Sequence, residues 1–169
     1  MPEQTSSPLV GVLMGSASDW PTMEHCAATL QKLEVPYEAN VLSAHRTPDE
    51  AIEYSSTAAS RGIKVLICAA GGAAHLAGVI SAKTLLPVLG VPMKGWSTDG
   101  LDALLSTVQM PGGVPVGTLA IGKAGAVNAA LLAVAILATN DPALGERYAK
   151  FRADKAASVK ASKLPPPNV

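Results

Sequence analysis

The sequence predicts one α/β domain in which five parallel strands are covered by helices on both faces. Short apolar runs alternate with longer helical patterns along the 169-residue chain, and this alternation is typical of a parallel sheet with helical crossovers. The length also fits a single domain. For five strands the common doubly wound order is 2-1-3-4-5, an expectation taken from known folds rather than from the spacing.

Five segments are expected to form the strands. Each is a short apolar run bounded by turn residues, which is the pattern of a buried strand. The first, LVGVLM, ends directly before Gly15. The expected strands are residues 9–14, 36–42, 63–69, 86–91 and 116–121.

Helical spacing of apolar residues predicts the segments between the strands. In the first of them, Met23 and Leu30 share one face. The second has a marked start, since Thr47, Pro48 and Glu50 form a capping-box pattern with proline at the first helical position. The expected helices are residues 19–33, 49–61, 75–83, 101–108, 123–139 and 142–157.

The expected catalytic domain occupies residues 9–157. Residues 1–8 are short and polar, lack the basic and apolar regions of a secretory signal, and are expected to be a disordered N-terminus. Residues 158–169 are expected to be a C-terminal tail, because the closing sequence LPPPNV cannot be helical.

Charge and hydropathy disfavour a nucleic-acid-binding protein and a membrane protein and favour an oligomer. Thirteen basic residues balance thirteen acidic ones, which disfavours a strongly basic nucleic-acid binder. Charged residues are only 15%, against roughly 25% in typical soluble domains, so a small monomer would expose too few charges to stay in solution. The longest apolar run, residues 124–138, is shorter than the ~20 residues that cross a bilayer. We therefore expect a homo-oligomer with no membrane segment and no nucleic-acid partner.

The two cysteines, Cys26 and Cys68, form no disulfide framework and lack metal-ligand spacing. Both are expected to be buried, reduced thiols, which fits a cytoplasmic setting. The chain has no Walker A pattern and no GxGxxG motif after a strand, and no cluster of histidine, cysteine or carboxylate residues indicates a metal site. We expect neither a metal nor a cofactor.

Three loops carry the candidate site. They are residues 15–19, 43–48 and 70–75, and each follows one of the first three expected strands. In the order 2-1-3 the first strand lies between the other two. All three loops then meet at the carboxyl edge of the sheet, where ligands bind in such folds.

Each loop offers distinct chemistry and has a simpler alternative. Ser16 and Ser18 supply hydroxyl donors for an anion, although the local pattern alone favours a plain helix cap at Ser18 or Asp19. Asp19 would repel a phosphate, so a functional Asp19 would accept hydrogen bonds from sugar hydroxyls. In the second loop, Arg46 suits phosphate binding and His45 suits proton transfer near neutral pH; a solvated loop is the alternative.

The third loop has no large side chain before His75, so a ligand could approach its backbone closely. Its alternative is a glycine-rich turn that ends in a capping histidine. Gly71 and Ala73 would form a small, apolar wall, and His75 would be a hydrogen-bonding partner at the start of the next helix.

Four motifs in this order resemble the PurE family, the N5-carboxyaminoimidazole ribonucleotide mutases of purine biosynthesis. They are residues 15–20 (GSASDW), 43–48 (SAHRTP), 70–76 (AGGAAHL) and 108–111 (VQMP). The segment 122–130 (GKAGAVNAA) is also similar, and the likeness covers residues 10–151. Two features depart from the family pattern: Ala77 stands where many members have proline, and residues 93–99 differ from the usual form.

The resemblance implies a flavodoxin-like three-layer α/β/α sandwich with a five-stranded, or slightly larger, parallel sheet. It also implies a homo-octamer that converts N5-carboxyaminoimidazole ribonucleotide to 4-carboxy-5-aminoimidazole ribonucleotide by decarboxylation and recapture of CO2. The family pattern makes His45 the acid and base. The substrate-binding residues that it implies are Ser16, Ser18, Asp19, Ser43, Arg46, Gly71, Ala73, His75 and Leu76.

Three other functions remain open from the sequence. A second class of the family carboxylates aminoimidazole ribonucleotide directly with external CO2 and shares the core motifs. A non-catalytic flavin- or nucleotide-binding module could use the same sheet, because fold alone does not determine function. A purely structural oligomer would need no site at all.

Overall fold

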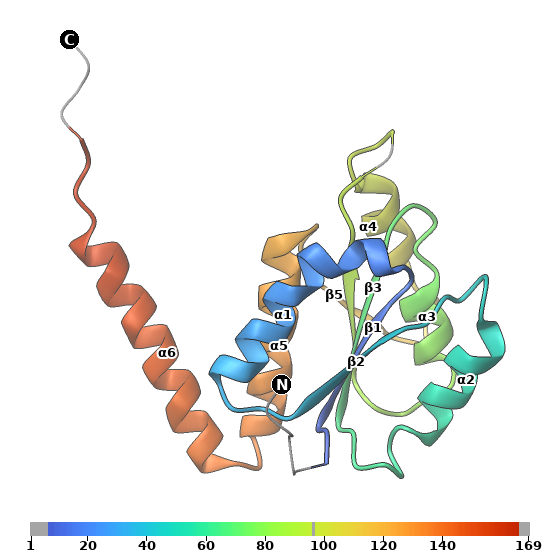
Figure 1. Cartoon of the computed structure of the whole chain (residues 1–169), viewed down its shortest axis with the longest axis horizontal. Coiled ribbons are helices and arrows are strands. Elements are labelled where there is room, and N and C mark those ends of the chain that lie inside the picture. The colour runs from blue at the N-terminus through green and yellow to red at the C-terminus, as the bar shows by residue number, and fades with distance from the viewer. Residues whose placement is uncertain (1–6, 96, 166–169) are drawn as a thin grey trace.

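One parallel sheet organises the chain, and its strand order is β2-β1-β3-β4-β5 (Figure 1). The computed structural model describes residues 7–95 and 97–165. Every neighbouring pair of strands is parallel, which confirms the predicted order. The strands are β1 (Val10–Met14), β2 (Tyr37–Val41), β3 (Val65–Ala70), β4 (Val88–Pro92) and β5 (Gly117–Thr118).

Burial separates the central strands from the edges. All residues of β1 and β4, and all but the last of β3, are buried, because helices cover both faces of a parallel sheet. The outer strand β2 alternates between half-buried and exposed positions. At the other edge, β5 is much shorter than the predicted residues 116–121, since only Gly117 and Thr118 pair with β4.

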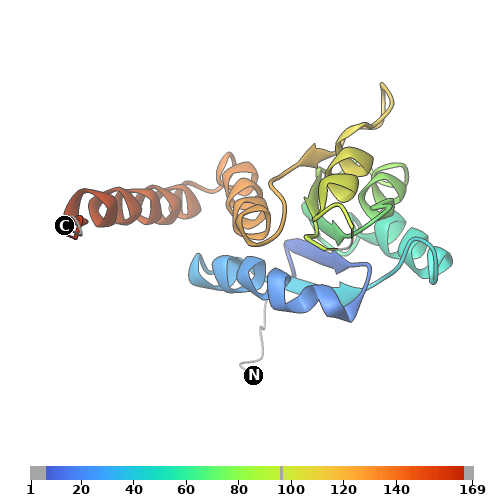
Figure 2. The same ribbon diagram turned by 90° about the horizontal axis from the view of Figure 1, so that it is seen from above.

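Helices cover the sheet in two layers, so the predicted three-layer sandwich is confirmed (Figure 2). Helices α1 and α5 pack together on one face, whereas α2, α3 and α4 cover the other. A short 3-10 turn precedes α1. The helical segments are η1 (Ala17–Asp19), α1 (Trp20–Lys32), α2 (Pro48–Thr57), α3 (Leu76–Ser81), α4 (Leu101–Val108), α5 (Lys123–Ala138) and α6 (Pro142–Ala161).

Alternate strand residues point to two separate cores. Val12 and Ile67 face the α1 and α5 layer, and Leu13 and Leu66 face the α2 and α3 layer. All four side chains are fully buried. Because successive side chains of a strand point to opposite faces, each central strand supplies both cores and must be apolar throughout.

Several boundaries differ from those predicted. Helix α2 ends at Thr57 rather than at residue 61, and α6 continues to Ala161, beyond the predicted end at 157. Helix α3 forms with Ala77 in place of the family's usual proline, as expected of a good helix former. Residues 1–6 of the predicted disordered N-terminus, residues 166–169 of the predicted tail, and Trp96 within residues 93–99 lie outside the described residues.

Helix α6 extends away from the rest of the domain (Figures 1 and 2). Among its residues, Leu144 alone is buried. Over residues 7–95 and 97–165, no helix combines the length and the apolar character that spanning a membrane requires. Cys26 and Cys68 are free and buried, as predicted; burial raises the pKa of both thiols, that of Cys26 to about 12.

Candidate active site

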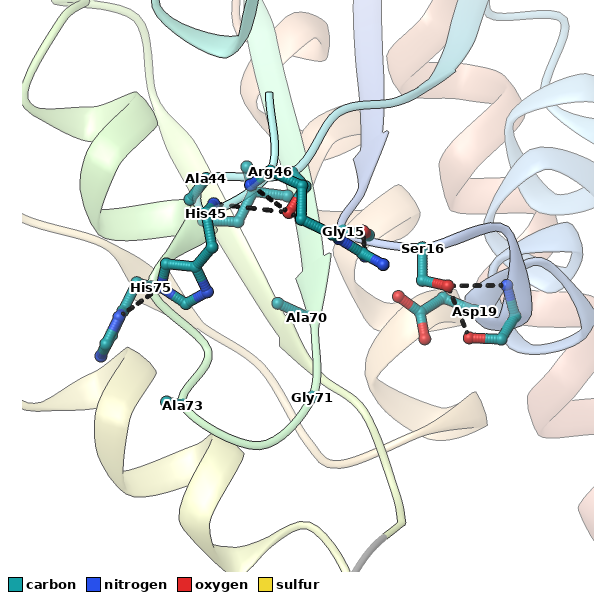
Figure 3. Close-up of a pocket in the computed structure, with 13 residues that line it drawn as sticks. Gly15, Ser16, Asp19, Ala44, His45, Arg46, Ala70, Gly71, Ala73 and His75 are labelled. Atoms are coloured by element: carbon teal, nitrogen blue, oxygen red, sulfur yellow. Dashed lines mark hydrogen bonds between the residues drawn. The ribbon is translucent and has the colours of Figure 1, made fainter. Parts of the chain in front are cut away.

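A cavity of about 390 Å³ opens at the carboxyl edge of the sheet, where the loops after β1, β2 and β3 meet (Figure 3). All ten residues that the sequence singled out line it. They are Ser16, Ser18, Asp19, Ser43, His45, Arg46, Gly71, Ala73, His75 and Leu76. Gly15, Ala44 and Ala70 complete the lining. The predicted convergence of the three loops is therefore confirmed.

The loop after β1 is shaped by its own serines. The hydroxyl oxygen of Ser16 accepts hydrogen bonds from the Ser18 backbone N–H (3.2 Å) and the Ser18 hydroxyl (2.8 Å). Ser16 is thus the cap of the 3-10 turn, whereas the side chain of Asp19, at the start of α1, makes no capping hydrogen bond. Asp19 does occupy the N-cap position of α1, as the simpler alternative expected, but without a side-chain capping hydrogen bond. The Asp19 carboxyl instead lies on the cavity side, towards Arg46 (Figure 3).

Asp19 is the titratable cavity residue with a shifted pKa. Burial raises the pKa of its carboxyl, because removing water disfavours the charged form. A backbone hydrogen bond from Ser16 and the positive charge of Arg46 act in the opposite direction and offset part of that rise. The carboxyl is therefore a half-buried acceptor beside a guanidinium group.

Ser43 organises the loop after β2. Its buried hydroxyl oxygen accepts hydrogen bonds from the backbone N–H of Arg46 (3.2 Å) and of His45 (3.4 Å), and from Nε of Arg46 (3.3 Å). Arg46 Nη2 donates to the carbonyl oxygen of Gly15, which joins this loop to the one after β1. The predicted catalytic residue His45 and the predicted substrate-binding residue Arg46 are therefore both held by the Ser43 side chain.

Thr47 has a different role from the predicted helix cap. Its hydroxyl oxygen accepts a hydrogen bond from the Ser43 N–H (2.8 Å) and lies 3.2 Å from the Ser43 carbonyl oxygen, to which it donates. It makes no capping hydrogen bond to α2, so the capping box is not formed. Pro48 does occupy the start of α2 as predicted. Thr47 closes the loop on itself and so keeps His45 and Arg46 at the cavity.

The two cavity histidines are in direct contact. Nε2 of His45 lies 2.8 Å from Nδ1 of His75, and the rings are perpendicular with centroids 4.9 Å apart. Figure 3 shows the other ring nitrogen of His45 on the side of Ala70. Sequence reasoning placed both histidines at one edge but did not foresee this contact, because they are 30 residues apart in different loops.

The loop after β3 bends at a position whose backbone conformation favours glycine. Gly72 has φ +62°, in the left-handed region that other residues rarely adopt. Gly71 and Ala73, on either side of Gly72, line the cavity and have little or no side chain there. Sequence reasoning missed Ser106 of α4, whose hydroxyl oxygen accepts a hydrogen bond from the Ala74 N–H (3.0 Å). Two adjacent hydroxyl residues in α4, Ser106 and Thr107, were the available signal.

Known proteins share both the sequence and the fold. Residues 9–158 match the family described as AIR carboxylase. The N5-carboxyaminoimidazole ribonucleotide mutase of Bacillus subtilis (strain 168) is 57% identical over 152 residues, 90% of this chain and 94% of that protein. The protein of that name from Pseudomonas aeruginosa is 58% identical over 153 residues, with the same coverage of both chains.

The fold comparison agrees with the sequence comparison. The crystal structure of Treponema denticola PurE aligns with a TM-score of 0.82 at 26% identity, over 90% of this chain and 94% of that one. The family match spans all three cavity loops and the whole sheet, so the resemblance drawn from four short motifs is confirmed. The chain therefore belongs to the AIR carboxylase family.

Proposed function

We propose that the protein is an isomerase that converts N5-carboxyaminoimidazole ribonucleotide to 4-carboxy-5-aminoimidazole ribonucleotide in purine biosynthesis. One observation carries this proposal: His45 and Arg46, adjacent in sequence, extend towards opposite ends of one cavity (Figure 3). A proton-transfer group then lies at one end and an anion-binding group at the other. The relatives named as mutases share more than half of their residues with this chain.

Arg46, Ser16 and Ser18 are proposed to hold the phosphate of the ribonucleotide. A guanidinium group binds phosphate oxygens in pairs, and the two serine hydroxyls lie beside it in the cavity. Asp19 is proposed to accept hydrogen bonds from the ribose hydroxyls, because its carboxylate would repel the phosphate itself. Binding energy from these groups, remote from the reacting atoms, would orient the imidazole ring towards His45.

The reaction moves one carboxyl group and one proton in opposite directions. The bond between N5 and the carboxyl carbon breaks, CO2 is released, and N5 gains a proton. C4 of the ring then attacks the CO2 carbon, and the new C4–C bond is followed by loss of the C4 proton. A single group that donates to N5 and later accepts from C4 balances both steps, and His45 is proposed for this role.

His75 is proposed to orient His45 in both protonation states. When Nε2 of His45 carries hydrogen it donates to Nδ1 of His75, and the other nitrogen of His45 is free to accept a proton. When His45 is protonated, both of its ring nitrogens carry hydrogen, so Nε2 still donates to Nδ1 of His75 while the second N–H lies on the cavity side and can be given to the substrate. The same contact therefore serves the acid and the base.

The remaining cavity residues shape the site around the substrate. Ser43 holds the loop of His45 and Arg46, as its hydrogen bonds show. Gly71 and Ala73 are proposed to form the wall against which CO2 is retained, and Leu76, buried at the start of α3, closes its apolar side. CO2 is small and uncharged, so a small apolar wall suits it.

The proposal includes a homo-octamer in the cytoplasm, as the family pattern implies. Large apolar side chains that remain exposed on the single chain support an assembly. They include Leu85, Leu101, Leu105, Val108 and Leu132. Three of them, Leu101, Leu105 and Val108, lie on α4, and such a group of exposed apolar side chains is typical of surfaces that are covered in an oligomer.

An isotope-fate assay tests the proposed function. Freshly made substrate labelled with 13C in its N5-carboxylate is mixed with enzyme in excess unlabelled bicarbonate, and the product is examined by NMR. Label retained at the C4 carboxylate is expected, because the carboxyl group is transferred within the site. Label washed out, with a rate that rises with bicarbonate, would instead establish a direct carboxylase. Folded protein that forms no product would exclude both enzymes and favour a binding module.

A further inference from the structure

The loop that forms the small wall of the cavity is tied to α4 by two adjacent hydroxyls. The Ala74 N–H donates to Oγ of Ser106 (3.0 Å). Oγ1 of Thr107, which donates to the Ala103 carbonyl oxygen (2.7 Å), lies 3.5 Å from the Ala74 carbonyl oxygen. The Ser106 hydroxyl also lies 3.4 Å from the Gly72 carbonyl oxygen. Side chains of one helix thus approach both backbone polar groups of a single loop residue, Ala74.

The backbone N–H and carbonyl groups of Ala74 are buried, so water cannot serve as their hydrogen-bonding partner. The residue is only 2% exposed, so its N–H must find a partner inside the protein. Ser106 supplies it while donating its own hydrogen to the Asp102 carbonyl oxygen (2.8 Å) within α4. The hydroxyl is therefore satisfied in both directions, and it lies behind the loop, outside the cavity lining.

The positions of two cavity residues depend on the position of the Ala74 backbone. Ala73 precedes Ala74 and belongs to the wall, and His75 follows it and contacts His45. The bend at Gly72, with φ +62°, places no side chain that could brace the loop from within. A displacement of Ala74 would therefore move the wall and the partner of the proposed acid and base together.

From this arrangement we infer that Ser106 is a positioning residue that holds the Gly71–Ala74 wall closed, so that CO2 formed in the cavity is recaptured before it escapes. The inference rests on the proposed mutase function. Ser106 touches neither substrate nor CO2 in this account. Its effect passes through the Ala74 N–H, and it should change the fate of CO2 more than the binding of the nucleotide.

The test compares Ser106→Ala with wild type in the 13C assay described above. Without the hydroxyl, the buried Ala74 N–H loses its partner and the wall loosens. The proportion of product that has exchanged its label with bicarbonate is expected to rise by about 2- to 10-fold, the factor that one hydrogen bond contributes. The KM for the nucleotide should change little, because Arg46 and the serine loop are untouched.

Label exchange separates a positioning role from a merely structural one. Unfolded enzyme makes no product, so partial unfolding lowers the rate without altering the labelled fraction. Ser81→Ala is the matched control, since Ser81 likewise donates from a helix to a distant loop carbonyl, that of Pro115 (2.6 Å), away from this cavity. Wild-type label retention is expected in Ser81→Ala, and also in Ser106→Thr, which keeps the hydroxyl.

The outcomes distinguish this inference from the proposed function. Wild-type enzyme that loses its label overturns both. Wild type that retains its label while Ser106→Ala retains it equally overturns the inference alone. If Ser106→Ala does not fold, Ser106→Cys decides, because a thiol of similar size is a weak acceptor for the Ala74 N–H. Raised exchange in Ser106→Cys supports the inference, and full retention in that variant overturns it.

Discussion

At the scale of single residues, each cavity side chain taken alone could be an ordinary helix cap or loop residue, and it is their combination that matters. Ser43 holds Arg46 and His45, Arg46 reaches across to Gly15, and His45 contacts His75. No one of these contacts specifies an activity. Together they direct a proton-transfer group and a cationic group into one cavity, and that combination supports the chemistry proposed for it.

His45→Asn is expected to fold and to bind the nucleotide but to lose turnover by at least ~10²-fold, because asparagine cannot carry a proton between N5 and C4. Initial rates with fresh substrate, together with calorimetric titration of the product, check this expectation. His25→Asn serves as the control, since His25 lies within α1 and not in the cavity. Near-wild-type turnover by His45→Asn would remove His45 from the mechanism.

At the scale of elements, the sheet and its helices approach so closely that one added methyl group matters. A Cβ atom on Gly125, in the first turn of α5, would lie 1.7 Å from the carbonyl oxygen of Ala120. That oxygen belongs to the backbone of the segment leading into α5. Both atoms belong to or are attached directly to backbone, so the clash could be relieved only by moving α5 or the end of the sheet.

Gly125→Ala is therefore expected to destabilise the protein by about 3 kcal/mol, the upper range for overpacking. Urea unfolding followed by circular dichroism measures the change. Gly145→Ala in α6 is the control: its added Cβ would be 4.0 Å from the Cβ of Ala138, which is ordinary contact, and alanine favours a helix by about 1 kcal/mol over glycine. Equal stability of the two variants would contradict the close approach.

Glu38 of β2 is bound by Tyr54 of α2 and by Arg61, which lies in the turn after that helix. Tyr54 donates a hydrogen bond to Oε1 of Glu38 (2.6 Å), and Arg61 donates to the same oxygen. Burial by itself would raise the pKa of Glu38, but the hydrogen bonds from Tyr54 and Arg61 and the charge of Arg61 bring that pKa below its usual value of 4.5. The unfolded chain therefore binds a proton on Glu38 more readily than the folded protein does.

This difference predicts how stability depends on pH. Glu38 contributes stability above pH 4.5 and loses that contribution as the pH falls through its lower, folded-state pKa. Glu38→Gln is expected to be less stable than wild type at pH 7 by up to about 1 kcal/mol, with the gap closing in acid. Urea unfolding between pH 3 and pH 7 measures the gap.

Glu34→Gln is the matched control for this pH series. Glu34 is 3.8 Å from Arg147 and its side chain is 76% exposed, so its loss should leave the stability profile unchanged. A gap between wild type and Glu38→Gln that stays constant with pH would contradict the assignment of the lowered pKa to Glu38.

At the scale of the whole molecule, one chain leaves apolar surface uncovered. Leu101, Leu105 and Val108 are 52%, 49% and 48% exposed, and their spacing places them on one side of α4, opposite the buried Ala103 and Thr107. Low charge content and this stripe both favour association with further copies.

The octamer proposed from the family pattern predicts that the wild-type protein sediments as an oligomer of eight chains. Leu105→Lys places a charge within the α4 stripe and is expected to lower the sedimenting mass while the helical signal in circular dichroism is kept. Analytical ultracentrifugation of both proteins provides the measurement. A monomeric wild type would contradict the octamer, and an unchanged mass in the variant would assign the contact to another face.

The sequence by itself determined the alternation of strands and helices, the positions of the three cavity loops, the ten lining residues and the family. The alternation and the loops follow from local patterns, because apolar runs mark buried strands. The family and the full set of ten residues follow from the resemblance of four short motifs to the PurE family. The order of the strands then brings the loops together without further information.

Only the tertiary structure decided which groups meet across the loops. The contact of His45 with His75 and the partner of Ala74 on α4 depend on three-dimensional packing. The short extent of β5, which pairs with β4 only at Gly117 and Thr118, was likewise not visible in the sequence. Hydrogen bonds between residues 30 or more apart form only when helices pack at a particular distance, and no local pattern encodes that distance.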